Sequence, residues 1–126
     1  MRRVVIDMQA LFAAAVDDVL HQSGFGFETV KCKSPEQTLS LCRAQPPDIL
    51  LMDVMSHPPR RLEERLKIRD ELKKIAPGCK IVLMVDENSE KKAADQVRLA
   101  KKDGLIEGFI YGSTSAAYLS AVIDAL

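Results

Sequence analysis

Two aspartates, Asp7 and Asp53, each stand at the end of a short apolar run. Aspartate is a poor strand former, so its place there needs a reason. One reason is capping, because an acid at a strand end often begins the loop into the next helix. The other is a carboxylate pair that binds a hard cation and presents one oxygen as a nucleophile. Two such acids, on strands expected to be neighbours, favour the second interpretation.

The elements that must position these acids alternate regularly. Short β-branched runs, each too short for a helix, predict strands at Arg3–Asp7, Phe27–Lys31, Asp48–Asp53, Lys80–Val85 and Gly108–Tyr111. The run at 48–53 is apolar without alternation, which is typical of a strand buried on both faces of a parallel sheet.

Helical patterns fill the gaps between these runs. The first helix carries an apolar stripe from Phe12 to Leu20, and the second begins at Ser34, a good N-cap. The third runs from about Pro59 to Ile75, but its apolar residues point in two directions, so we expect an irregular start or a more solvated helix. The fourth spans roughly Ser89 to Lys102. The fifth follows a Ser113–Ser115 cap.

Alternating strands and helices predict one α/β domain over residues 1–126. We expect a three-layer, doubly wound, flavodoxin-like fold whose five-stranded parallel sheet has the order 2-1-3-4-5. Ligands and chemistry then lie at the carboxyl ends of the strands, where Asp7 and Asp53 stand.

The segment Asp48–Met55 resembles the phosphoacceptor strand of response-regulator receiver domains, found in bacterial two-component systems. Gly108–Tyr111 looks like their fifth strand, and Phe109 falls where that family carries a switching aromatic. The resemblance implies that Asp53 accepts a phosphoryl group from a histidine kinase. It also implies that Asp7, Asp53 and the backbone carbonyl of Met55 hold Mg²⁺.

The sequence departs from that pattern at four places. Met8 follows Asp7 where the family has a second acid, and a thioether is not a ligand that Mg²⁺ favours. At the switch position that normally holds a hydroxyl, Val85 or Asp86 stands, and Gly112 replaces the lysine. The proline after the phosphoacceptor is displaced into His57-Pro58-Pro59. Phosphoryl transfer depends on positioning and charge stabilisation, so we expect weak Mg²⁺ binding and poor phosphorylation, or none.

Three hypotheses follow for the function. The first is a degenerate receiver, a signalling module rather than an enzyme, acting through protein–protein contacts with a histidine kinase or another signalling protein. It would include a homodimer through the face of helix four, strand five and helix five. The second is a receiver that is still phosphorylated at Asp53 with Mg²⁺. The third is a small-ligand or nucleotide-binding module on the same fold.

Composition narrows these choices. The 126 residues are 47% hydrophobic, and 18 basic residues balance 18 acidic ones. The zero net charge gives no support for non-specific DNA binding, which we expect only through an output domain outside this chain.

No apolar run approaches the length of a membrane span, so a cytoplasmic protein is expected. Cys32, Cys42 and Cys79 lack zinc or disulfide spacing and are expected in the core.

Overall fold

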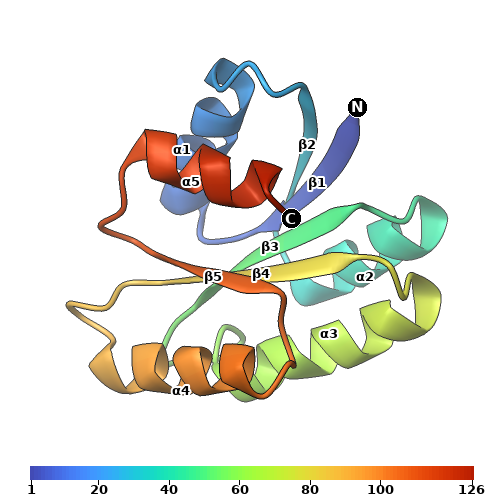
Figure 1. Ribbon diagram of the computed structural model, residues 1–126. Helices are drawn as coiled ribbons and strands as arrows, with labels where there is room; N and C mark the ends of the chain where they lie inside the picture. Colours follow the sequence, from blue (N-terminus) through green and yellow to red (C-terminus); the bar gives the residue numbers. More distant parts are fainter.

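A computed structural model describes residues 1–126 of the chain. Strands and helices alternate along the whole length, as Figure 1 shows. The strands are β1 (Arg2–Asp7), β2 (Phe27–Cys32), β3 (Ile49–Val54), β4 (Lys80–Val85) and β5 (Gly108–Tyr111). The helices are α1 (Ala10–Gln22), α2 (Pro35–Ala44), α3 (Leu62–Ile75), α4 (Lys91–Lys102) and α5 (Ala116–Asp124).

The five strands form one sheet in the order β2-β1-β3-β4-β5, and every neighbouring pair is parallel. This confirms the predicted flavodoxin-like topology. β1, which ends in Asp7, and β3, whose penultimate residue is Asp53, are direct neighbours, with Asp7 in register with Met52. Their carboxyl ends therefore lie at the same edge of the sheet.

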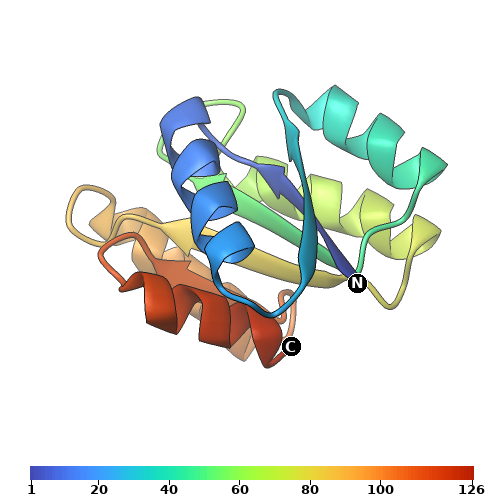
Figure 2. The same cartoon turned by 90° about the horizontal axis from the view of Figure 1, so that it is seen from above.

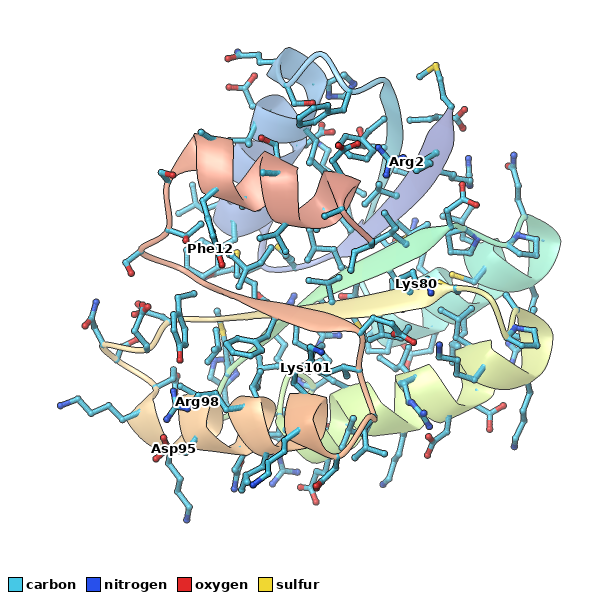
Figure 3. All side chains as sticks on the ribbon, viewed as in Figure 1. Arg2, Phe12, Lys80, Asp95, Arg98 and Lys101 are labelled. Carbon is cyan, nitrogen blue, oxygen red and sulfur yellow. The ribbon has the colours of Figure 1, made fainter.

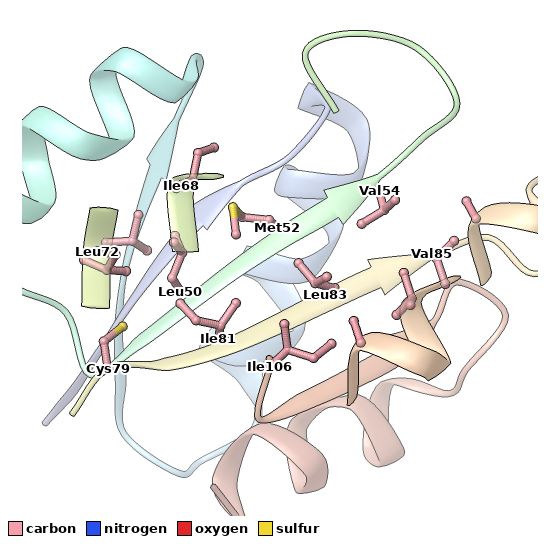
Figure 4. Close-up of a cluster of buried hydrophobic side chains, with 14 of the residues drawn as sticks. Leu50, Met52, Val54, Ile68, Leu72, Cys79, Ile81, Leu83, Val85 and Ile106 are labelled. Atoms are coloured by element: carbon pink, nitrogen blue, oxygen red, sulfur yellow. The ribbon is translucent and has the colours of Figure 1, made fainter. Parts of the chain in front are cut away.

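The sheet is covered on both faces. Helices α1 and α5 pack on one face, and α2, α3 and α4 pack on the other (Figures 1 and 2). Successive residues of the central strands alternate between the two layers: Val5 and Leu50 belong to the α2–α4 side, whereas Val4 and Leu51 belong to the α1–α5 side. Figure 4 shows the α2–α4 layer, where Leu50, Met52 and Leu83 meet α3 and α4.

Local capping fixes two of the helix starts. The Ser34 hydroxyl accepts the N–H of Gln37 at the start of α2, and the Ser115 hydroxyl accepts the N–H of Tyr118 at the start of α5. Both caps were predicted. Helix α4 begins at Lys91, two residues later than predicted. None of the five helices combines the length and the apolar character needed to cross a membrane.

Helix α3 begins at Leu62 rather than near Pro59, because the segment before it folds into a loop. Its buried residues are Arg65, Ile68 and Leu72, which share one face at spacings of three and four. The expected irregular start therefore lies in the loop, and the helix itself is regular. The first residue of this buried face is the charged Arg65, which lies at the carboxyl edge of the sheet.

The three cysteines are free and buried in the α2–α4 layer, as predicted. Burial raises the pKa of Cys42 to about 11 and that of Cys79 to about 12. Burial thus favours the protonated thiols, which are poor nucleophiles.

Candidate functional site

The two aspartates lie together at the carboxyl edge of the sheet, and both are almost completely buried. Asp7 is 1% exposed and Asp53 is 2% exposed. An isolated carboxylate at such a depth is costly to ionise, so its surroundings decide what it can do. Those surroundings are two arginines, a threonine and a backbone N–H group.

Arg65 of α3 binds both aspartates. Its Nη2 donates to Asp53 Oδ1 at 2.8 Å and to the Asp7 carbonyl oxygen at 3.1 Å, while its Nε donates to the Asp53 carbonyl oxygen at 2.8 Å. Its Nη1 lies 3.2 Å from Asp7 Oδ2, an ion-pair contact whose N–H direction does not meet hydrogen-bond geometry. The Arg65 side chain is 0% exposed. The Arg65 guanidinium thus links the ends of β1 and β3 from the α3 side of the sheet.

Arg60 reaches the same carboxylates from the loop between β3 and α3. The Arg60 N–H donates to the His57 carbonyl at 3.0 Å, and the Met55 N–H donates to the Arg60 carbonyl at 2.8 Å, so the loop folds back over the strand end. This turn brings Arg60 Nη1 to 2.8 Å from Asp53 Oδ1 and 4.0 Å from Asp7 Oδ1. Asp53 Oδ1 is therefore held by two guanidinium groups at once.

Two further hydrogen bonds hold the carboxylates. Asp53 Oδ2 accepts the N–H of Gln9, the residue that precedes α1, at 2.9 Å. Asp7 Oδ2 accepts the Thr38 hydroxyl of α2 at 2.8 Å. The acids thus tie together the starts of α1 and α2, the body of α3 and the loop before it.

The charges of this cluster balance, since two aspartates face two arginines. A divalent cation at this edge needs several carboxylate or carbonyl oxygens that are free to turn toward it. Here Arg60 and Arg65 hold Asp53 Oδ1, the Gln9 N–H holds Asp53 Oδ2, and Arg65 stands between the two acids. The donor set does not fit Mg²⁺ in this arrangement. Met55, the expected carbonyl ligand, lies at the start of the loop that carries Arg60.

The positions that depart from the receiver pattern have distinct surroundings. Met8 is 2% exposed and packs in the α1–α5 layer. Val85 is buried in the opposite layer.

The other two positions lie in the loops after β4 and β5. Asp86 Oδ1 accepts the N–H of Asn88 at 3.0 Å. This hydrogen bond and a second one from Ser89 lower the pKa of Asp86. Gly112 lies beside Asp86, and a Cβ added to it would meet only ordinary contacts, at 3.6 Å or more. No side chain at these positions brings a hydroxyl or an ammonium to Asp53.

The predicted switch aromatic, Phe109, is half-buried against the α2–α4 layer. Its ring meets that of Tyr111 edge-on, with centroids 5.5 Å apart. The Tyr111 hydroxyl accepts Arg98 Nη1 at 2.7 Å, and Arg98 also pairs with Asp95 on α4, as Figure 3 shows. The α4–β5 face is therefore held by contacts that do not involve Asp7 and Asp53, which form what we call the acidic edge of the sheet.

Sequence reasoning missed Arg60 and Arg65 entirely. A signal for Arg65 was present, because it precedes Ile68 by three residues and Leu72 by seven, on the apolar face of its helix. A charged residue at such a position needs a buried partner, and the unexplained acids were the available ones. Arg60 offered no comparable signal, since its placement depends on the turn that begins at His57.

No family model matches this sequence, and no curated protein is detectably similar to it. Solved structures show the fold clearly. A CheY-like response regulator receiver domain protein from Methanospirillum hungatei superposes with a TM-score of 0.76 at 13% identity, covering 99% of this chain and 92% of that one. A response regulator receiver domain from Clostridium thermocellum gives 0.76 at 19% identity, covering 99% and 93%.

The receiver domain of NtrX from Brucella abortus is also similar, with a TM-score of 0.74 at 20% identity over 98% of this chain and 95% of that one. A longer NtrX structure in complex with ADP gives 0.76 at 18% identity, and this chain covers 26% of it. The chain thus has the fold of response-regulator receiver domains, a fold that also occurs within longer proteins.

Proposed function

We propose that this chain is a receiver-type signalling domain that acts through protein–protein contacts and does not use phosphorylation of Asp53 as its switch. The observation that carries this proposal is the buried cluster in which Arg65 and Arg60 hold Asp53 and Asp7. The fold supports the signalling class, and the cluster supports independence from phosphorylation.

Phosphorylation of Asp53 would need one of its oxygens to attack a phosphorus atom from outside the protein. Oδ1 is bonded to two guanidinium groups, Oδ2 accepts the Gln9 N–H, and the residue is 2% exposed. A phosphoryl group brings about two negative charges at neutral pH. Admitting it would require breaking the existing ion pairs, and no lysine or hydroxyl stands at Gly112 or Asp86 to hold it. Any Mg²⁺ binding would be weak for the same reason, because the metal must displace Arg65.

The partners that fit this proposal are a histidine kinase or another signalling protein, and a second copy of the chain through the α4–β5–α5 face. DNA binding would belong to an output domain elsewhere in a longer protein. A cytoplasmic location stays a prediction.

The deciding experiment is incubation with acetyl phosphate and Mg²⁺, followed by intact-mass measurement. We expect no phosphoryl adduct on the wild type, while a phosphorylatable receiver domain in the same reaction gains one. An adduct that forms on the wild type and is lost in Asp53→Ala would overturn the proposal and establish the alternative, a receiver phosphorylated at Asp53.

A second measurement tests whether Arg65 is the group that keeps Mg²⁺ from the aspartates. In Arg65→Met the aspartates lose their central partner, so Mg²⁺ should raise the melting temperature of this variant more than that of the wild type. Equal shifts in both proteins would mean that Arg65 is not what keeps the metal out.

A further inference from the structure

A cavity of about 380 Å³ opens beside the acidic edge. It lies between α1 and α5 and reaches the loops that follow β4 and β5, which Figure 1 shows on the same side of the molecule. Figure 3 places Phe12 there, near the start of α1 and beside the segment that enters α5. Its volume falls within the range of small-molecule sites. Gly112 lines it, and the missing side chain at this position leaves part of the space open.

The walls of this cavity are apolar on the side of the helices. Nine of its 17 lining residues are hydrophobic, among them Phe12 and Val19 of α1, Met84 of β4 and Leu119 of α5. Such a surface accepts the carbon skeleton of a ligand and excludes water from it.

The loop side of the cavity is polar and carries only negative charge. Its ionisable lining residues are Asp53, Asp86 and Glu90, with no lysine, arginine or histidine. Asp53 is neutralised by the arginine cluster, but neither Asp86 nor Glu90 forms an ion pair. Two backbone N–H groups stabilise the ionised form of Asp86, and Glu90 Oε1 receives only a long bond from Ser56, at 3.3 Å. An anion at this edge, including a nucleotide or free phosphate, would be repelled.

We propose that this cavity binds a small organic cation, an amine whose apolar body lies between α1 and α5 and whose ammonium group is held by Asp86 and Glu90. Burial of the apolar body supplies affinity, and the charge-assisted hydrogen bonds supply selectivity. The signalling meaning of this site rests on the proposed function, in which an amine would serve as an input in place of a phosphoryl group.

Two of the lining residues explain how occupancy could be transmitted. Met55 and Glu90 also line a second groove, between α3 and α4, together with Leu66 and Leu99. Glu90 is the residue that immediately precedes α4. An ammonium that pulls Glu90 toward the cavity would therefore change the end of that groove, on the opposite face of the sheet.

Three probes of matched shape test the proposal: phenethylamine, 2-phenylethanol and 3-phenylpropionate, titrated into the isotope-labelled protein and followed by NMR. We expect phenethylamine to shift the amide signals of α1, residues 86–90 and residues 112–116. The alcohol should bind about tenfold more weakly, the loss expected for one charge-assisted hydrogen bond, and the carboxylate should not bind. Equal binding of all three probes, or no shifts at these positions with the amine, would overturn the proposal.

Variants test the contribution of the two carboxylates separately from that of the apolar cavity. Asp86→Asn and Glu90→Gln keep an acceptor oxygen at each position, so the loop should stay folded while the affinity for phenethylamine falls about tenfold. Ala15→Phe fills the cavity from α1 and should abolish binding of the amine. Glu71→Gln, on α3 and outside the cavity lining, is the matched control and should bind as the wild type does.

The two proposals can fail separately. If phenethylamine does not bind and acetyl phosphate gives no adduct, the amine site is wrong and the phosphorylation-independent receiver stands. If an adduct forms, the proposed function is wrong, and the titration of the unmodified protein still decides whether the amine site exists.

Discussion

At the scale of single residues, the central feature is a guanidinium placed between two buried carboxylates. Arg65 is planar, carries five N–H donors and stays charged at any ordinary pH, so it can satisfy several oxygens at once. A buried ion pair of this kind gains little net stability, because both charges must first leave water. Removing one partner, however, leaves an uncompensated charge, so the cluster is sensitive to loss of its central member.

The first prediction concerns that member. Arg65→Met should lower the free energy of unfolding by about 3–5 kcal/mol, because Asp7 and Asp53 keep only Arg60 as a cationic partner. Urea denaturation followed by circular dichroism measures the change. Arg61→Met is the matched control, since the Arg61 side chain is 46% exposed and its ion pairs lie at the surface, where about 1 kcal/mol or less is expected. Equal losses in the two variants would show that the buried cluster contributes nothing particular.

At the scale of elements, a second charged contact joins α3, β4 and the turn before β5. Burial raises the pKa of the Glu107 carboxyl, but hydrogen bonds from Lys73 Nζ and the Ile81 N–H, each at 2.7 Å, outweigh it and hold the pKa below its ordinary value of 4.5. A depressed carboxyl pKa means that the folded state favours the ionised form. The resulting stability is present above pH 4.5 and is lost as the pH falls through the folded-state pKa.

The second prediction follows from that sign. Glu107→Gln should cost about 1 kcal/mol at neutral pH, because the Lys73 ammonium loses its charged partner. The difference from the wild type should shrink in acid, where the wild-type carboxylate is protonated as well. Unfolding free energies measured at about pH 7 and about pH 3 test this. A difference that grows toward acid would contradict the assigned direction of the pKa shift.

The third prediction concerns the contact between α4 and β5. Tyr111→Phe removes the hydroxyl that accepts Arg98 Nη1, and we expect a loss of about 0.5–1 kcal/mol with the ring of Phe109 still half-buried. Tyr118→Phe is the control, because the Tyr118 side chain is exposed and its hydroxyl forms no hydrogen bond within the chain. Thermal unfolding gives the stabilities. A loss in Tyr118→Phe as large as that in Tyr111→Phe would rule out the Arg98 contact as the cause.

The elements were predictable from sequence to a greater degree than the site they build. Strands β4 and β5 begin and end where predicted. Only Lys80 of β4 is exposed, so its hydrophobic run is almost unbroken, whereas β5, at the sheet edge, is a short apolar run between two glycines. Asp7 and Asp53 were found because an acid at the end of such a run is unusual. Arg60 was not found, because its place depends on a turn with no periodic pattern. Arg65 was overlooked because arginines on a helix usually face solvent.

At the scale of the whole molecule, the acidic edge connects four separate parts of the chain without leaving a net charge. Gln9 before α1, Thr38 of α2, and Arg60 and Arg65 around α3 all end on the two aspartates. In such an arrangement the two aspartates carry no uncompensated charge that could respond to an added phosphoryl group. The α4–β5–α5 surface is then expected to present one conformation whatever the phosphodonor concentration.

The last prediction uses that surface. Tyr118 of α5 is 59% exposed, and an exposed aromatic side chain suits a contact with a second copy. We expect sedimentation velocity to show the same degree of self-association with and without acetyl phosphate and Mg²⁺. Tyr118→Glu should weaken that association by placing a charge in the predicted contact, and Tyr118→Phe should leave it unchanged. A dimer that forms only when phosphodonor is present would mean that the signal passes through Asp53 after all, and a strict monomer would remove the homodimer from the proposed function.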